Sequence, residues 1–97
     1  MVNLKNKHGL KVSLYVSDIT GYPMVVTTID FNWYDNNPSC SLAKLCEYQE
    51  NMDITFSERL ERLEHEITPL SNDLILEHMT ALVLKAGFTY DFRKVVD

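Results

Sequence analysis

The chain has 97 residues, of which 45% are hydrophobic and 24% are charged. That length accommodates one domain, so we expect residues 1–97 to form a single folded unit and not a disordered or fibrous chain. The net charge of −5 is opposite in sign to the basic footprint of nucleic-acid-binding proteins. We therefore expect neither direct binding to nucleic acid nor attraction to an anionic membrane surface.

The sequence predicts a cytoplasmic location. No apolar run approaches the roughly 18–20 residues of a transmembrane helix, and the N-terminal residues lack the apolar stretch of a secretory signal. The two cysteines, Cys40 and Cys46, agree with this prediction, because two cysteines in a cytoplasmic chain are more often free thiols than a disulfide. Their spacing matches neither a zinc knuckle nor a redox motif.

Two strands are predicted in the first third of the chain, at residues 10–16 and 24–33. Both segments alternate between apolar and polar side chains, which is the pattern of a half-buried strand. Turn-forming residues at 17–23 separate them, so an antiparallel hairpin is expected. The positions that share one face are Leu10, Val12, Leu14 and Val16 in the first strand and Val25, Thr27, Ile29, Phe31 and Trp33 in the second.

Two helices are predicted in the middle of the chain. The first covers residues 40–50, with Ser39 or Ser41 as its N-cap. The second covers residues 57–67, because the segment T-F-S-E at 55–58 has the T-x-x-E pattern of a capping box, which marks the start of a new helix. Apolar residues then recur at helical spacing.

A third helix is predicted at residues 69–86. Pro69 suits the first helical position, and Gly87 suits the position just after the last turn. Alternating aromatic residues then predict a strand at 88–93. We expect the core to include Leu74, Leu82, Ile29 and Phe31.

The predicted order is therefore β-β-α-α-α-β. It describes an α+β fold in which a small antiparallel sheet, made of the hairpin and the C-terminal strand, is covered on one face by two or three helices. The C-terminal strand is expected to pair with one strand of the hairpin. Because a three-stranded sheet has two open edges, a homodimer is a further prediction.

The negative charge is concentrated in one segment. Residues 47–66 contain seven acids and only two bases, Arg59 and Arg62, so this segment carries the whole net charge of −5 and the rest of the chain is neutral. A charged helix is usually a solvated face of the protein. The alternative is that this local field steers a basic protein partner toward the chain.

We find no motif that carries a reaction. Phosphate-binding loops and nucleophile elbows are absent, and His8, His65 and His78 do not have the spacing of a zinc site. We therefore expect no catalytic residues, no metal and no cofactor. A cysteine–histidine pair that uses Cys40 or Cys46 with His78 stays an alternative, although no third residue that would orient it is indicated.

These observations favour a non-catalytic protein-interaction module that binds a basic protein surface. Its size is that of small inhibitors, immunity proteins and phage accessory proteins, which is an analogy only. Aromatic residues near the end of the hairpin either fill the core or add contacts, since tyrosine and tryptophan are enriched at interfaces. The predicted partner-binding residues are Glu47, Glu50, Asp53, Glu58, Glu61, Glu64, Trp33 and Tyr34.

Two other classes of function stay open. The first is a small enzyme or ligand-binding domain, which needs a pocket between the sheet and the helices with polar groups that converge in it. The second is a structural subunit of a larger assembly. An interaction protein would instead show an exposed apolar or charged patch.

Overall fold

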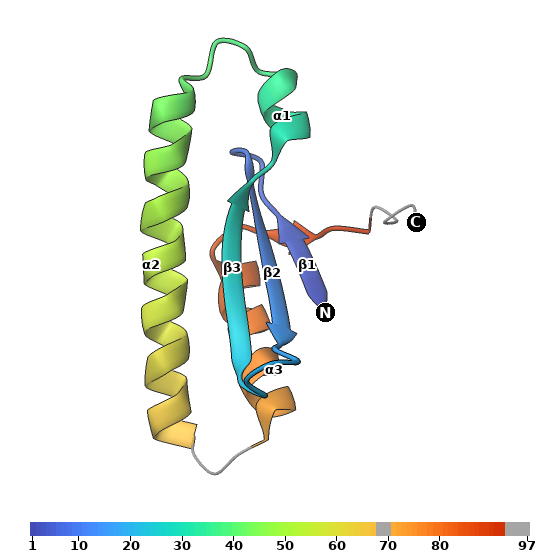
Figure 1. Ribbon diagram of the computed structural model, residues 1–97. Coiled ribbons are helices and arrows are strands. Elements are labelled where there is room, and N and C mark those ends of the chain that lie inside the picture. Colours follow the sequence, from blue (N-terminus) through green and yellow to red (C-terminus); the bar gives the residue numbers. More distant parts are fainter. Residues whose placement is uncertain (68–70, 93–97) are drawn as a thin grey trace.

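Figure 1 shows the computed structural model of the chain, which describes residues 1–67 and 71–92. It confirms the α+β class, with helices packed against a small antiparallel sheet. The elements are β1 (Val2–Lys5), β2 (Leu10–Val16), β3 (Pro23–Ile29), α1 (Phe31–Asp35), α2 (Leu42–Ile67), α3 (Asn72–Lys85) and β4 (Thr89–Tyr90).

The sheet has four strands in the order β3-β2-β1-β4, and each neighbouring pair is antiparallel. Strand β1 was not predicted, because its four residues are too few to establish an alternating pattern. The C-terminal strand pairs with β1, with Leu4 opposite Tyr90, so its predicted place beside a hairpin strand was wrong. It is also shorter than predicted, and residues 93–97 lie outside the described residues.

The predicted hairpin is confirmed as β2 and β3, but the second strand ends earlier than residue 33. The carboxylate of Asp30 accepts a hydrogen bond from the backbone N–H of Trp33 at 3.3 Å and thereby caps the short helix α1. Aspartate is a strong N-cap residue, and this capping turns the chain out of the sheet. Phe31 consequently lies in a helix and is 60% exposed, so its predicted place in the core was wrong.

The two helices predicted at 40–50 and 57–67 are one continuous helix, α2. It begins at Leu42, two residues later than predicted, and Ser41 is the one of the two predicted caps that accepts a hydrogen bond from its first turn. The hydroxyl of Thr55 does not cap a new helix. It donates a hydrogen bond to the carbonyl of Asn51 at 2.9 Å, within the helix. No proline or glycine interrupts residues 42–67, so nothing forces a break there. At 26 residues, α2 is about 39 Å long.

Helix α3 ends as predicted, with Ala86 at the C-cap and Gly87 just beyond it at a φ of +99°. Its N-cap is Ser71, which accepts a hydrogen bond from the N–H of Leu74 at 3.4 Å. The predicted start at Pro69 lies outside the described residues.

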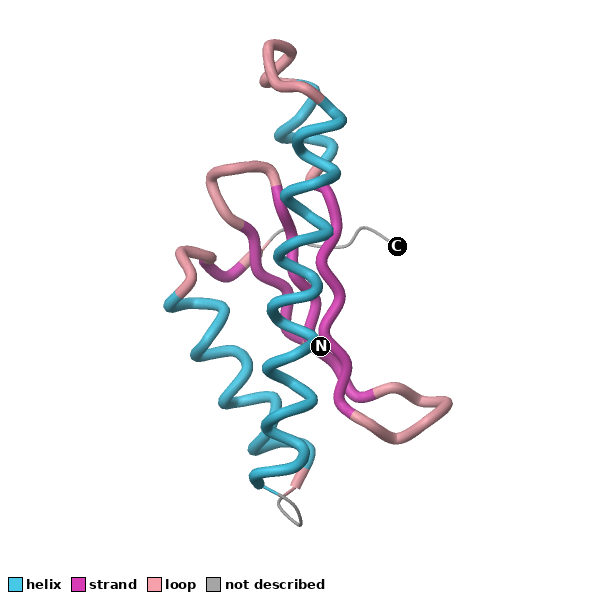
Figure 2. The backbone as a smooth tube through the Cα atoms, turned by 90° about the vertical axis from the view of Figure 1, so that its left-hand side faces the viewer, coloured by secondary structure: helices cyan, strands magenta, loops and turns pink. Residues whose placement is uncertain are grey.

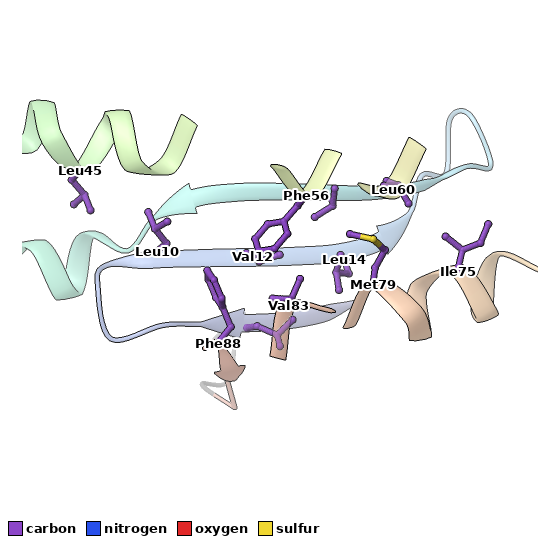
Figure 3. Packing of buried hydrophobic residues seen from close by; sticks show 12 residues of the cluster. Leu10, Val12, Leu14, Leu45, Phe56, Leu60, Ile75, Met79, Val83 and Phe88 are labelled. Atoms are coloured by element: carbon purple, nitrogen blue, oxygen red, sulfur yellow. The ribbon is translucent and has the colours of Figure 1, made fainter. Parts of the chain in front are cut away.

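The core lies between the sheet and the two long helices, as Figure 3 shows. Strand side chains of one face meet side chains from α2 and α3. Of the residues predicted to be core, Ile29, Leu74 and Leu82 are half-buried. The buried hydrophobic residues are Leu4, Leu10, Val12, Leu14, Val25, Leu45, Phe56, Leu60, Ile75, Met79, Val83 and Phe88.

Helix α2 lies along the edge strand β3 and covers part of that edge (Figures 1 and 2). The backbone N–H of Thr27 donates to the carboxylate of Asp53 at 3.0 Å, and the carbonyl of Thr27 accepts from the side chain of Gln49 at 2.8 Å. Asp53 and Gln49 are one helical turn apart, so together they satisfy both backbone groups of one edge residue. The homodimer stays a prediction, but both backbone groups of Thr27 on this edge already have hydrogen-bond partners within the chain.

Replacement of the Asp53 side chain should destabilise the fold. We expect Asp53→Ala to lower the free energy of unfolding by about 1–3 kcal/mol, because the N–H of Thr27 then loses its acceptor in a half-buried place. Asp53→Asn keeps a carbonyl oxygen and should recover most of the loss. Asn51→Ala, two residues away and exposed, is the matched control. The measurement is urea denaturation of the unmodified protein and of the three variants. Equal midpoints would show that the contact between Asp53 and Thr27 adds nothing to stability.

Candidate functional site: the outward face of α2

One side of α2 is anchored to the core. Leu45, Phe56 and Leu60 are buried, and Met52 and Leu63 are half-buried against the same cluster. These positions recur at steps of three, four or seven residues, so they mark one line along the helix. Residues displaced by half a turn from that line face away from the protein.

The line opposite the core is acidic. Four glutamates and one isoleucine occupy it, and all five side chains are exposed. Together they span about 21 Å of the helix axis. Successive members are three or four residues apart, which keeps them on one side of the helix. We call this line the outward stripe; it consists of Glu47, Glu50, Ile54, Glu58 and Glu61.

Ile54 lies at the centre of the outward stripe and is 51% exposed. An isolated exposed isoleucine needs no explanation. This one is flanked by carboxylates on both sides and by no base on its own line. Ile54 was not predicted as a site residue, because the break expected between residues 50 and 57 removed the periodicity that places it in register with the glutamates.

Two of the predicted acidic site residues are turned away from this line. Asp53 is half-buried and holds the backbone of β3, as described above. Glu64 is also half-buried and faces the loop between β2 and β3. The structure therefore brings four of the six predicted acids together, while the other two lie on the side of α2 that faces the sheet edge.

A groove adjoins the C-terminal end of the outward stripe, between α2 and the end of the hairpin, and has a volume of 390 Å³. Its floor is apolar, since Pro23, Val25 and Leu60 are buried. At its rim are the 66% exposed ring of Tyr22 and the carboxylate of Glu61. We call it the hairpin groove; it is also lined by Thr20, Met24, Ser57 and Glu64.

The predicted aromatic site residues, Trp33 and Tyr34, lie on α1 and not on the outward stripe. Both are half-buried and pack against the core. Trp33 lies over Gly9, where a Cβ would be 2.5 Å from the Trp33 ring atom Cε3. A glycine is required there for space and for its φ of +94°. Packing is thus the role that the contacts of Trp33 show.

The cysteines and histidines form no evident reactive group. Cys40 is half-buried, Cys46 is exposed, and both are free. His78 lines a groove with Arg59 and Lys85, and neither cysteine lines that groove. Within residues 1–67 and 71–92, no cluster of three or more histidine, cysteine, aspartate or glutamate side chains is placed to hold a metal ion.

Comparison with protein-family models, with curated proteins and with solved structures found no match for the chain. In the part of the chain that the structure describes, no helix combines the length and the apolar character needed to cross a membrane.

Proposed function

We propose that the chain is a non-catalytic interaction domain that binds a basic surface of another protein through the outward stripe of α2. The single observation that carries the proposal is the exposed Ile54 set among four exposed glutamates on the helix line opposite the core. Interfaces commonly place an apolar contact at the centre and charged contacts around it.

The spacing of the glutamates supports this proposal over a merely solvated helix face. Glu47 and Glu50 are three residues apart, and so are Glu58 and Glu61. Like charges at this spacing destabilise a helix by a few tenths of a kcal/mol per pair. Solvated helices usually alternate the sign of charge along a face. The outward stripe itself carries only acids. Lys44 and Arg62 lie within about one helical turn of Glu47 and Glu58 and offset part of the repulsion, and a basic partner would neutralise the rest.

The hairpin groove offers a place for one basic side chain of the partner. Its apolar floor suits the hydrocarbon stem of an arginine or lysine, and Tyr22 presents an aromatic ring to the cationic end. Glu61 belongs both to the groove and to the outward stripe, so one partner surface can contact the two together. Arginine is among the residues that most often dominate binding energy at interfaces.

We further propose that the partner is met in the cytoplasm. Two free cysteines support this, because reducing compartments keep thiols from pairing.

The concentration of charge on one helix also supports rapid association with the partner, since a local field of one sign raises the rate at which an oppositely charged surface is encountered.

The test is affinity capture from a lysate of the native host, followed by mass spectrometry. The stripe variant carries Glu47→Lys, Glu50→Lys and Glu58→Lys. These side chains point away from the core, so the variant should fold. We expect the unmodified protein to capture a basic protein at about 0.1 M salt and to lose it near 1 M, where the Debye length falls to about 3 Å. The stripe variant should not capture it.

The matched control carries Asp35→Lys, Glu66→Lys and Glu77→Lys, which change the net charge equally from three exposed positions on α1, α2 and α3. It should capture the same protein as the unmodified chain. Equal capture by all three proteins would contradict the proposal and would leave α1, with Tyr34 and the exposed Phe31, as the next surface to test.

A further inference from the structure

The flank of α2 that faces α3 has the opposite character to the outward stripe. On α3, Ile75, Met79 and Val83 are buried in the core. The neighbouring line on α3, which includes His78 and Lys85, borders α2 instead. The two helices leave a groove between them on this flank, separate from the sheet and from the hairpin groove.

This groove has a volume of 260 Å³, and we call it the interhelix groove. Three of the described lining residues are apolar, two are the bases Arg59 and Lys85, and one is His78. None of the acids among residues 1–67 and 71–92 lines it, although the chain has 14 acids and 9 bases. The lining residues are Arg59, Leu63, His78, Ala81, Leu82 and Lys85.

The floor of the interhelix groove is held in place by the core. Leu63 and Leu82 are half-buried and pack against the buried cluster. Their remaining exposed surface, together with Ala81, therefore forms a supported apolar patch. Burial of such a patch by hydrocarbon is favourable, because it removes apolar surface from water.

The rim of the interhelix groove favours an anion. Arg59 on α2 and Lys85 on α3 approach it from two helices, and His78 lies two turns before Lys85. Among residues 1–67 and 71–92, the structure shows no carboxylate paired with these three side chains. A bound anion would therefore meet the two cations Arg59 and Lys85 without a carboxylate already paired to them, and its hydrogen bonds to them would be charge-assisted.

From this lining we propose that the interhelix groove binds a small anionic amphiphile, namely a free monocarboxylate with a medium-length hydrocarbon chain. The carboxylate lies between Arg59 and Lys85, and the hydrocarbon covers Leu63, Ala81 and Leu82. The groove volume of 260 Å³ exceeds that of a cavity that holds benzene, which is about 150 Å³. It is about nine times the volume that one water molecule occupies, roughly 30 Å³. Decanoate is of suitable size. This site shares no residue with the outward stripe.

The test uses decanoate as the probe, below its micelle-forming concentration, in a titration followed by the backbone amide signals of the ¹⁵N-labelled protein. We expect saturable shifts centred on Leu63, Ala81 and Leu82. Decyltrimethylammonium, which has the same chain length and the opposite charge, should not bind at equal concentrations. Acetate, which has the charge without the chain, should not bind either.

Matched variants separate the site from the net charge. Arg59→Gln with Lys85→Gln should weaken decanoate binding by roughly tenfold or more, as expected for lost hydrogen bonds to a charged group. Lys7→Gln with Lys44→Gln changes the net charge equally at two exposed positions outside the groove and should leave the affinity unchanged. Equal weakening by both pairs, shifts elsewhere in the protein, or equal binding of either control ligand would overturn the proposal.

Discussion

Phe56→Ala is expected to lower the free energy of unfolding by about 3–5 kcal/mol, the usual cost of removing a buried phenylalanine. Phe56 is 2% exposed, and its ring meets that of Phe88 edge-on with centroids 5.8 Å apart. It joins the middle of α2 to the chain that leads into β4, as Figure 3 shows. Its loss leaves a cavity that the closely packed core around it cannot readily fill.

Ile54→Ala is the matched control for this prediction. Ile54 lies two residues before Phe56 on the same helix but faces outward, so its replacement should change stability by no more than about 0.5 kcal/mol. Urea denaturation measures both variants. Similar losses for Phe56→Ala and Ile54→Ala would mean that the core-facing line of α2 is misassigned.

Ile54→Pro is expected to cost about 3 kcal/mol or more, because proline inside a helix removes a hydrogen bond and clashes with the preceding turn. The proline at position 54 tests whether α2 is one helix, because residue 54 lies between the two helices predicted at 40–50 and 57–67. In a linker between two helices, proline at an exposed position would be nearly harmless. The loss of the isoleucine side chain is measured separately by Ile54→Ala, so any additional loss of stability in Ile54→Pro comes from the backbone. A midpoint equal to that of Ile54→Ala would contradict a continuous α2.

The sequence predicted the elements whose signals are local and complete. Strand β2 was found because its alternation is regular over its whole length, and the end of α3 was found because Gly87 marks it. Strand β1 was missed because its four residues gain their structure from pairing on both sides. The T-x-x-E pattern at 55–58 was misleading, because a capping box has meaning only where the preceding turn of helix is absent.

The candidate site was predictable in part. The excess of acids at 47–66 is visible in the sequence, but the outward direction of Glu47, Glu50, Glu58 and Glu61 follows only once α2 is known to be unbroken. Asp53 faces the backbone of Thr27 because α2 lies along the edge of β3. That placement depends on contacts between distant segments, and no local pattern reports it. Both grooves likewise arise where two elements meet.

The continuity of α2 links the fold to the proposed function. One line of the helix anchors it to the core, and a second line holds the edge of β3 through Gln49 and Asp53. The helix is thereby fixed in rotation, so the outward stripe is presented without further ordering. A pre-ordered surface loses less conformational entropy on binding than a flexible one.

The most direct test of the outward stripe is the association rate with the captured partner, measured by stopped flow as a function of salt. At about 0.1 M salt or below, the stripe variant should associate roughly tenfold or more slowly than the unmodified protein, and the difference should vanish near 1 M. The control variant with Asp35→Lys, Glu66→Lys and Glu77→Lys should associate at the same rate as the unmodified protein at every salt concentration. Association of the stripe variant at the unmodified rate in low salt would contradict a role for this surface in binding.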